Sequence, residues 1–303
     1  EFRVIAAMEE GNFVSETAQG YSVDNIVPDQ PMLTGTSIDD NLAVTLSWQP
    51  NQNEDFEIFN VHRNGEFIDS MTSLSFTETL PISQSQNYSV NAVEYSVYAQ
   101  DIHGNLSDPA TEYIRYSSKT MPIGNTLLSL TGEVEITSVP YHLDNILEDD
   151  VNVNFLIGQG VGLFNTDGNW SGNLNDFNSE SGYWINIGSG YTWNMFYEQL
   201  KQPCDEYTTT FGNNLLSYTW FDGAPTLDAL GGEEYASEHF QFIIGQGVGL
   251  FNTGTGWSGN LNNLSRTSGY WLNRLDTDDS FIWGFGNCAT PPVATLSKSE
   301  PFA

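Results

Sequence analysis

Two copies of one sequence pattern occupy the C-terminal part of the chain, and they constrain its fold more than any other feature. Gly-Gln-Gly-Val-Gly-Leu-Phe-Asn-Thr occurs at 158–166 and recurs identically at 245–253, an offset of 87 residues. Trp-Ser-Gly-Asn-Leu-Asn and Ser-Gly-Tyr-Trp follow in each copy at that same offset. Self-similarity at a fixed period indicates one structural unit that folds the same way each time. We therefore expect two repeat modules, at 121–200 and 208–288.

Within each module the residue patterns predict a short helix among several strands. The spacing of apolar residues in 139–147 and in 225–230 predicts the helix. Residues 155–164 and 242–251 are predicted to be apolar strands interrupted by glycines, where bulges or close backbone approach are expected. Each module is thus predicted to be a small β-rich α+β unit.

A second, earlier repeat indicates a β-sandwich. Residues 1–15 and 94–107 share a pattern of Glu, an aromatic residue, Val and Ala at alternate positions, followed by Gly-Asn and Ser. Alternating apolar residues predict a half-buried strand, and Gly-Asn predicts a tight turn. The spacing of the copies is the size of one sandwich domain. We expect 1–23 to be the last hairpin of a preceding sandwich and 24–117 to be a complete one.

The complete domain carries landmark residues in a familiar order. Leu46-Ser47-Trp48 precedes Tyr95-x-Val97-x-Ala99, and this arrangement resembles the fibronectin type III family. The resemblance implies a seven-stranded sandwich of two sheets, with Trp48 and Tyr95 in its core.

The repeat modules resemble a different group of proteins. Their set of Asn-x-Leu-x-Ser, Gly-x-Gly-Val-Gly, Trp-x-Gly-x-Leu and Gly-Tyr-Trp is similar to a repeat of large bacterial surface proteins and to modules of marine phage structural proteins. That resemblance implies no catalytic activity. The predicted fold class is mainly β: a fibronectin-III-like β-sandwich, then two small β-rich α+β modules, then a tail at 289–303.

The charge of the chain excludes several classes of partner. Eight Lys and Arg stand against 39 Asp and Glu, giving a formal net charge of −31. Such a surface repels nucleic-acid phosphates and anionic membranes. We expect no nucleic-acid partner, and no membrane insertion because no apolar run is long enough to span a bilayer.

An acidic chain attracts divalent cations, and one segment is a candidate Ca²⁺ site. It combines hard oxygen ligands from a linker and from a later turn, and it resembles the calcium-rigidified linkers of other tandem β-sandwich proteins. An ordinary turn, in which these side chains bond their own backbone, is the alternative. No other cofactor is expected. The residues are Asp24, Asn25, Asp29, Asp101 and Asn105.

The aromatic residues of the repeats have two interpretations. They are the core of a small module that is poor in aliphatic residues, or they form an exposed patch that binds a glycan or a partner, flanked by asparagines. The candidate patch residues are Trp170, Tyr183, Trp184, Trp257, Tyr270 and Trp271, and the flanking residues are Asn175, Asn186, Asn262 and Asn273.

The two cysteines, Cys204 and Cys288, lie on either side of the second module. A disulfide between them would close that module and would suit an oxidising compartment. Two free thiols are the alternative. The disulfide favours an extracellular, cell-surface or virion-surface location.

No residue pattern indicates catalysis, so we predict no catalytic residues and no enzyme activity. The glycine-rich repeat lacks the Lys-Ser/Thr of a phosphate-binding loop. The sequence favours a non-catalytic extracellular structural or adhesive protein, part of a larger surface, filament or virion-fibre protein. Its expected partners are copies of itself or surface glycans. The alternative is a carbohydrate-binding accessory region of a secreted enzyme.

Overall fold

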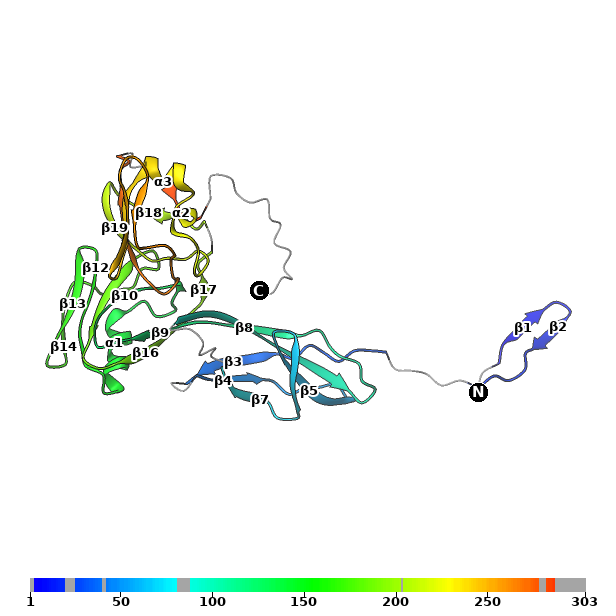
Figure 1. Ribbon diagram of the computed structural model, residues 1–303. Helices are drawn as coiled ribbons and strands as arrows, with labels where there is room; N and C mark the ends of the chain where they lie inside the picture. Colours follow the sequence, from blue (N-terminus) through cyan, green and yellow to red (C-terminus); the bar gives the residue numbers. More distant parts are fainter. Residues whose placement is uncertain are drawn as a thin grey trace. The chain divides into compact units, whose positions relative to one another are not determined.

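The computed structural model is mainly β, with short helices, and divides into two units (Figure 1). The first unit comprises Glu1–Leu80 and Glu94–Glu112, and the second comprises Pro81–Val93 and Tyr113–Ala303. No helix among the described residues is long and apolar enough to cross a membrane. The residues that the structure describes are 3–19, 25–39, 42–80, 88–202, 204–277 and 282–286.

A two-stranded hairpin begins the first unit, formed by β1 (Ile5–Met8) and β2 (Gly11–Val14). Met8 pairs with Gly11, so the turn consists of the two residues between them. The predicted turn at Gly11-Asn12 is therefore wrong, because these residues already belong to the second strand. The side chains of both strands are exposed, so the predicted half-burial within a preceding sandwich stays a prediction.

A β-sandwich forms the rest of the first unit. One sheet has the order β3-β4-β7, and the other has five strands in the order β16-β9-β8-β5-β6, where β16 is Tyr191–Tyr197. The three strands of the first sheet and β9, β8, β5 and β6 of the second make the seven-stranded sandwich implied by the resemblance to fibronectin type III domains, which confirms the predicted fold. The strands are β3 (Leu33–Ile38), β4 (Ala43–Trp48), β5 (Phe56–Arg63), β6 (Glu66–Met71), β7 (Ser75–Thr79), β8 (Tyr88–Asp101) and β9 (Ala110–Met121).

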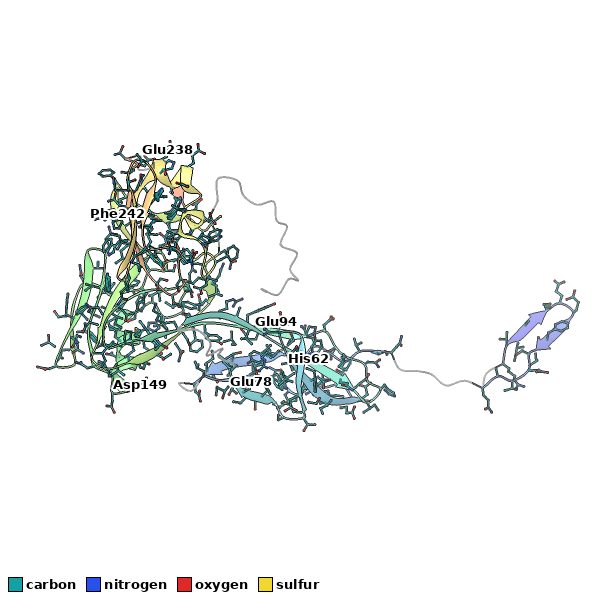
Figure 2. All side chains as sticks on the ribbon, viewed as in Figure 1. His62, Glu78, Glu94, Asp149, Glu238 and Phe242 are labelled. Atoms are coloured by element: carbon teal, nitrogen blue, oxygen red, sulfur yellow. The ribbon has the colours of Figure 1, made fainter. Side chains whose placement is uncertain are left out.

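The sandwich core forms because alternate residues of its strands point inward. Trp48 is 2% exposed and Tyr95 is fully buried, as predicted for both. The phenol of Tyr95 donates to Glu78 Oε1 at 2.7 Å. Glu78, labelled in Figure 2, also pairs with Arg63 at 2.7 Å. The buried hydroxyl of Tyr95 is thus satisfied by a carboxylate that has its own counter-charge.

Strand β9 continues past the sandwich. Its residues from Arg115 to Met121 pair with β16 (Tyr191–Tyr197), a strand of the first repeat module. The predicted end of the sandwich at residue 117 lies inside this strand, and the two units divide after Glu112 instead.

The first module is a five-stranded sheet covered by one helix. The sheet has the order β10-β15-β12-β13-β14, and α1 packs on its inner face through Val139, Leu143 and Ile146. The predicted helix is confirmed. The elements are β10 (Gly124–Ser129), β11 (Gly132–Glu133), α1 (Val139–Glu148), β12 (Val153–Gly158), β13 (Val161–Thr166), β14 (Asn169–Gly172), β15 (Gly182–Ile187) and β17 (Gln199–Leu200).

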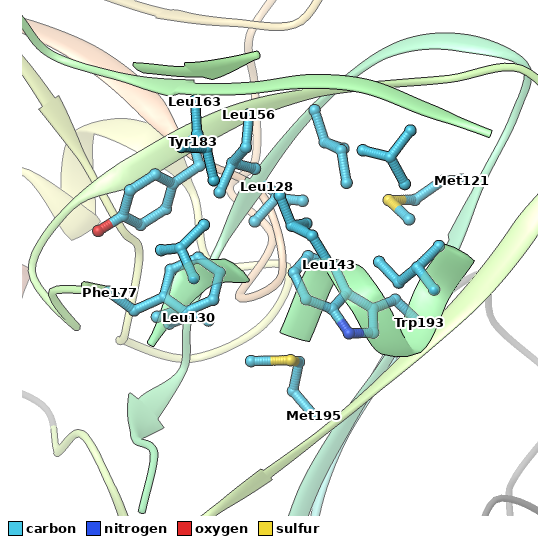
Figure 3. Close-up of a cluster of buried hydrophobic side chains, with 14 of the residues drawn as sticks. Met121, Leu128, Leu130, Leu143, Leu156, Leu163, Phe177, Tyr183, Trp193 and Met195 are labelled. Carbon is cyan, nitrogen blue, oxygen red and sulfur yellow. The ribbon is translucent and has the colours of Figure 1, made fainter. Parts of the chain in front are cut away.

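The core of this module lies between the inner face of the sheet, α1 and strand β16. Figure 3 shows Leu143 of the helix, Leu156 of the sheet and Trp193 of β16 directed into one apolar cluster. The ring of Phe177 lies 6.1 Å from that of Trp193, centroid to centroid. Three elements distant in sequence therefore share one core.

The second module repeats this topology. Its sheet has the order β19-β23-β20-β21-β22, strand for strand that of the first module. The predicted helix is confirmed as α2, and a further helix that the sequence did not indicate, α3, follows it. The elements are β18 (Tyr207–Thr208), β19 (Gly212–Leu216), α2 (Thr226–Ala229), α3 (Glu233–His239), β20 (Phe240–Gly245), β21 (Val248–Asn252), β22 (Trp257–Gly259), β23 (Tyr270–Arg274) and β24 (Ile282–Trp283).

The segments 155–164 and 242–251 are hairpins, which corrects the prediction of single interrupted strands. In the first module, β12 and β13 pair with Gly158 opposite Val161, leaving Gln159-Gly160 as a two-residue turn. Gly160 has a φ of +73°, a conformation that glycine adopts without steric cost. The glycine of the motif therefore reverses the chain rather than bulging it.

Replacement of one core side chain tests this packing. Ile185→Ala removes a fully buried side chain of β15 and should lower the free energy of unfolding of the second unit by about 2–5 kcal/mol. The measurement is denaturant unfolding of the whole chain. Ile123→Ala is the matched control, because Ile123 is 71% exposed and its loss should change stability by less than about 0.5 kcal/mol. Equal effects of both changes would contradict the described core.

Candidate binding surface

The outer face of each module sheet, opposite the helices, carries aromatic residues that are exposed or half-buried. In β15, Tyr183, Ile185 and Ile187 are buried, whereas the alternating Trp184 and Asn186 are half-buried on the opposite face. This alternation follows from the pleat of a strand, which sends successive side chains to opposite sides. Trp184 therefore lies outside the core while its neighbour Tyr183 lies within it.

Four outward residues of the first module form what we call outer strip 1: Phe155, Ile157, Phe164 and Trp184. Ile157 lies opposite Trp184 in the strand register, and Phe155 lies opposite Phe164. The two phenylalanine rings are 6.2 Å apart, and Phe164 is 50% exposed. Neighbouring strands thus place these side chains side by side on one face.

The second module carries the same surface, outer strip 2: Phe242, Ile244, Phe251 and Trp271. Its register is equivalent, with Ile244 opposite Trp271 and Phe242 opposite Phe251. The phenylalanine rings lie 6.0 Å apart, and Phe251 is 45% exposed. Figure 2 labels Phe242 on this surface. The repeat therefore presents one set of contact residues twice.

A row of asparagines borders each strip. In the first module, Asn154 donates to Asn186, which in turn donates to Asn125. In the second, Asn273 donates to Asn213 Oδ1 at 2.7 Å. Asparagine amides have two donor hydrogens and two acceptor lone pairs, and these bonds use only part of that capacity.

The structure corrects the predicted aromatic patch. Tyr183 and Tyr270 are only 2% and 4% exposed, and their hydroxyls accept hydrogen bonds from the backbone N–H groups of Asn178 and Ser265. Burial raises the pKa of Tyr183 above its ordinary value. These two residues are core residues, since they face inward.

Two tryptophans of the predicted patch also lie on the inner face. Trp170 packs against the core of the first module and donates from Nε1 to Asp144 Oδ1 of α1 at 2.7 Å. Trp257 does the same in the second module and donates to Ser237 Oγ of α3 at 2.9 Å. Only Trp184 and Trp271 of the predicted set belong to the outer strips.

Of the asparagines predicted to flank the patch, Asn186 and Asn273 border the strips and the other two do not. The backbone carbonyl of Asn175 accepts from Val139, and that of Asn262 accepts from Thr226, so both lie in loops at the helices. The predicted patch does not include the phenylalanines and isoleucines of the strips, because the prediction treats 155–164 as one strand. The segment before Gly158 is continuously apolar (Phe155-Leu156-Ile157), so it offers no alternation that separates outward side chains from core side chains.

The two modules meet through a glutamine of each hairpin turn. Gln159 accepts from the backbone N–H of Leu215 and donates to the carbonyl of Asn213, both at 2.8 Å. Reciprocally, Gln246 accepts from the N–H of Leu127 at 2.9 Å and donates to the carbonyl of Asn125 at 2.7 Å. Each side-chain amide thus pairs with the free edge of the other module's first strand, as a peptide group of a neighbouring strand would.

Close backbone approach completes this junction. A Cβ added to Gly182 would lie 3.2 Å from the Cα of Gly269, and one added to Gly269 would lie 3.1 Å from the Cα of Gly182. Equivalent residues of the two repeats therefore face each other, so the junction has approximate two-fold symmetry. It also adjoins outer strip 1, because Leu127 lies opposite Trp184 in the sheet.

One half-buried lysine lies at the junction. Lys119 of β9 donates to Ser268 Oγ of the second module at 3.0 Å. Burial lowers the pKa of Lys119 to about 8, and the nearby carboxylate of Asp222 offsets only part of that effect. The folded protein therefore holds the proton of this side chain less tightly than the unfolded chain does.

The structure brings together part of the predicted Ca²⁺ set. Asp101 Oδ1 accepts from the backbone N–H groups of His103 and Asn105, and Oδ2 accepts from the amide of Asn105 at 2.7 Å. Burial alone would raise the pKa of Asp101, but these hydrogen bonds and the His103 ring hold it below its ordinary value. Asp101 thus organises the turn after β8.

The other predicted ligands do not join this pair. The backbone N–H of Asp29 bonds the side chain of Asn53, no described contact brings the Asn25 side chain to Asp101, and Asp24 lies outside the described residues. Asp55 and His103 instead bring ligand atoms within 4.8 Å of those of Asp101. Ca²⁺ binding stays a prediction.

The structure describes one of the two cysteines of the predicted disulfide. Cys204 is disulfide-bonded, and its expected partner, Cys288, lies outside the described residues. The pairing itself stays a prediction.

Known proteins offer little likeness to this chain. No protein-family model matches it. No curated protein matches it. The solved structure of the Clostridium perfringens spore cortex lytic enzyme SleM is 18% identical over 28% of this chain, with a TM-score of 0.25. The match covers 27% of that structure, so the chain spans about a quarter of its length.

Two multidomain structures cover more of the chain. The central fibronectin-III array of RIM-binding protein is 11% identical over 83% of this chain and 91% of its own, with a TM-score of 0.24. The M60 catalytic domain with CBM51-1 and CBM51-2 from Clostridium perfringens ZmpB is 12% identical over 89% of this chain and 31% of its own, with a TM-score of 0.21. At such low TM-scores, the strand order described above is the basis for the sandwich assignment.

The reciprocal junction predicts reciprocal changes in amide exchange. Gln159→Ala should speed hydrogen exchange at the backbone N–H of Leu215 by roughly tenfold, because a buried donor loses its acceptor. Exchange at Leu127 should change little. Gln246→Ala should do the reverse, so each variant is the control for the other. Equal acceleration at both amides in either variant would contradict two independent contacts.

The lowered pKa of Lys119 predicts that the stability of the protein depends on pH. The unfolded chain holds this proton up to about pH 10.5, whereas the folded chain releases it near pH 8. The unfolded state therefore binds more protons between these values, and the free energy of unfolding should rise with pH, by up to about 1.4 kcal/mol per unit. Denaturant unfolding between pH 7 and 9.5 measures this slope.

Lys119→Met should remove this rise and make the protein more stable than the wild type at pH 7, because no charge is then desolvated. A variant with the wild-type slope would assign the dependence to other groups.

Proposed function

We propose that this chain is a non-catalytic extracellular protein with a structural or adhesive role, part of a larger surface, filament or virion-fibre protein. The observation that carries the proposal is the duplication of one exposed aromatic surface, as outer strips 1 and 2, on modules joined by reciprocal contacts. Contiguous exposed apolar residues on a protein mark sites of interaction. Two equal sites gain avidity for a partner that offers repeated contacts.

The chemistry of the strips supports contact rather than catalysis. Both consist of phenylalanine, isoleucine and tryptophan, none of which transfers protons or attacks a substrate at ordinary pH. The asparagine rows beside them are neutral hydrogen-bonding groups. Such a surface holds a partner by burial and hydrogen bonding.

The disulfide at Cys204 supports an extracellular location, because disulfides persist in oxidising compartments. The formal charge of −31 supports solubility there and disfavours nucleic acid as a partner. Copies of this chain or surface glycans are the partners proposed.

A carbohydrate-binding accessory region of a secreted enzyme is the second candidate. The specific observation in its favour is the asparagine row beside aromatic rings in both modules. In that case the strips would hold a polymeric substrate for a catalytic domain.

Immunogold electron microscopy of the native source, with antibody against the whole chain, tests the location. Label on a cell envelope, an extracellular filament or virus particles is the expected result. Label confined to soluble secreted material would overturn the structural role and favour the accessory region.

A further inference from the structure

We infer that outer strips 1 and 2 bind an uncharged polysaccharide, one repeat of the polymer against each strip. This inference gives the adhesive surface of the proposed function a ligand class, and it rests on that function. Its basis is the aromatic and amide side chains of the two sheet faces, the absence of ionisable side chains from both strips, and the duplication of the surface.

The aromatic rings supply the apolar half of the contact. The rings of pyranose sugars present a face of C–H groups, and such faces pack on aromatic side chains. Trp184 lies half-exposed between Leu127 and Ile157 of the neighbouring strands, which support it from both sides. Trp271 has the same supports in Leu215 and Ile244. Each indole is thus held between two apolar side chains and keeps part of its surface exposed.

The amide rows supply the polar half. Asn154 and Asn125 are exposed at either end of the first row, and Asn186 links them. Because the three side chains bond one another, their remaining donors and acceptors are fixed in direction before a ligand arrives. Sugar hydroxyls both donate and accept, so they match asparagine amides, which do the same.

Charge selects among polysaccharides. Neither strip and neither row contains an ionisable side chain, whereas the whole chain carries a formal charge of −31. An anionic polysaccharide would be repelled by the surroundings and would find no lysine or arginine in either strip. A cationic one would find no carboxylate in the strips. An uncharged polymer is not repelled by the acidic surroundings and needs no counter-charge in the strips.

The junction explains why two strips exist. Leu127 both supports Trp184 and offers its N–H to Gln246, so outer strip 1 is continuous with the contact between modules. Leu215 has the same two neighbours in Trp271 and Gln159. The two strips are therefore fixed relative to each other, and a ligand of repeated units is the kind that can use both.

Affinity electrophoresis of the full chain tests the inference. The gels contain one polysaccharide each: mixed-linkage β-glucan, xyloglucan, galactomannan, or alginate as the anionic probe. Retardation by at least one of the neutral polymers, and none by alginate, is expected. Titration calorimetry with oligosaccharides of the retarding polymer then gives the affinity of the wild type and its variants.

Variants at the two indoles locate the site. Trp184→Ala or Trp271→Ala alone should weaken binding about fivefold or more, and both together should abolish it. Phe211→Ala is the matched control: Phe211 is 62% exposed, lies outside both strips and should leave binding unchanged. Trp184→Tyr with Trp271→Tyr keeps an aromatic face at each position and should retain binding, which separates loss of stacking from loss of folding.

Three outcomes would overturn the inference: no retardation by any neutral polymer, unchanged binding in the double alanine variant, or self-association that this variant abolishes without polysaccharide binding. The last result would assign the strips to protein contact. If immunogold label lies on a surface but the protein binds no polysaccharide, only the proposed ligand is wrong and the structural role stands. If the protein binds polysaccharide but label is found only in soluble material, the proposed ligand stands and the structural role is wrong.

Discussion

The second unit depends on how the open edge of each module sheet is covered. Strands β10 and β19 are edge strands, and an unpaired edge is a template for aggregation. The amide of a glutamine side chain has the donor and acceptor of a peptide group, so Gln159 and Gln246 each complete two backbone hydrogen bonds of the other module's edge. Because the contact is reciprocal, it both protects the edges and fixes the modules, and the placement of the outer strips follows from it.

This contact explains which residues the two repeats share. The turn glycine provides a positive φ, the glutamine before it reaches the other module, and Gly182 and Gly269 leave room for the backbones to meet. Other junction residues differ between the repeats. Arg266 donates to the carbonyl of Lys201, whereas the residue that corresponds to it in the first module is Ser179. The backbone pairing is thus nearly symmetric, and the charged contacts around it are not.

Charge and contact are separated on this molecule. Carboxylates dominate the charged residues of the chain, and their mutual repulsion favours solubility. Both outer strips, in contrast, consist of uncharged residues. The cations near the junction, Lys119 and Arg266, are half-buried. Lys119 has a lowered pKa, and burial lowers that of Arg266 as well. An uncharged surface within an acidic one favours partners that need no counter-charge.

The sequence by itself determined the features that depend on short-range patterns. These are the two modules and the helix predicted at 139–147, because repetition and periodicity are local properties. The sandwich with Trp48 and Tyr95 in its core was implied by the resemblance of its landmark residues to fibronectin type III domains. Only the tertiary structure decided which face of a strand meets the core. Tyr183 and Trp184 are adjacent and equally aromatic, so no local pattern separates a core residue from a contact residue. The role of Gln159 was equally hidden, because its partner lies 54 residues away in sequence and only the pairing of the modules brings the two together.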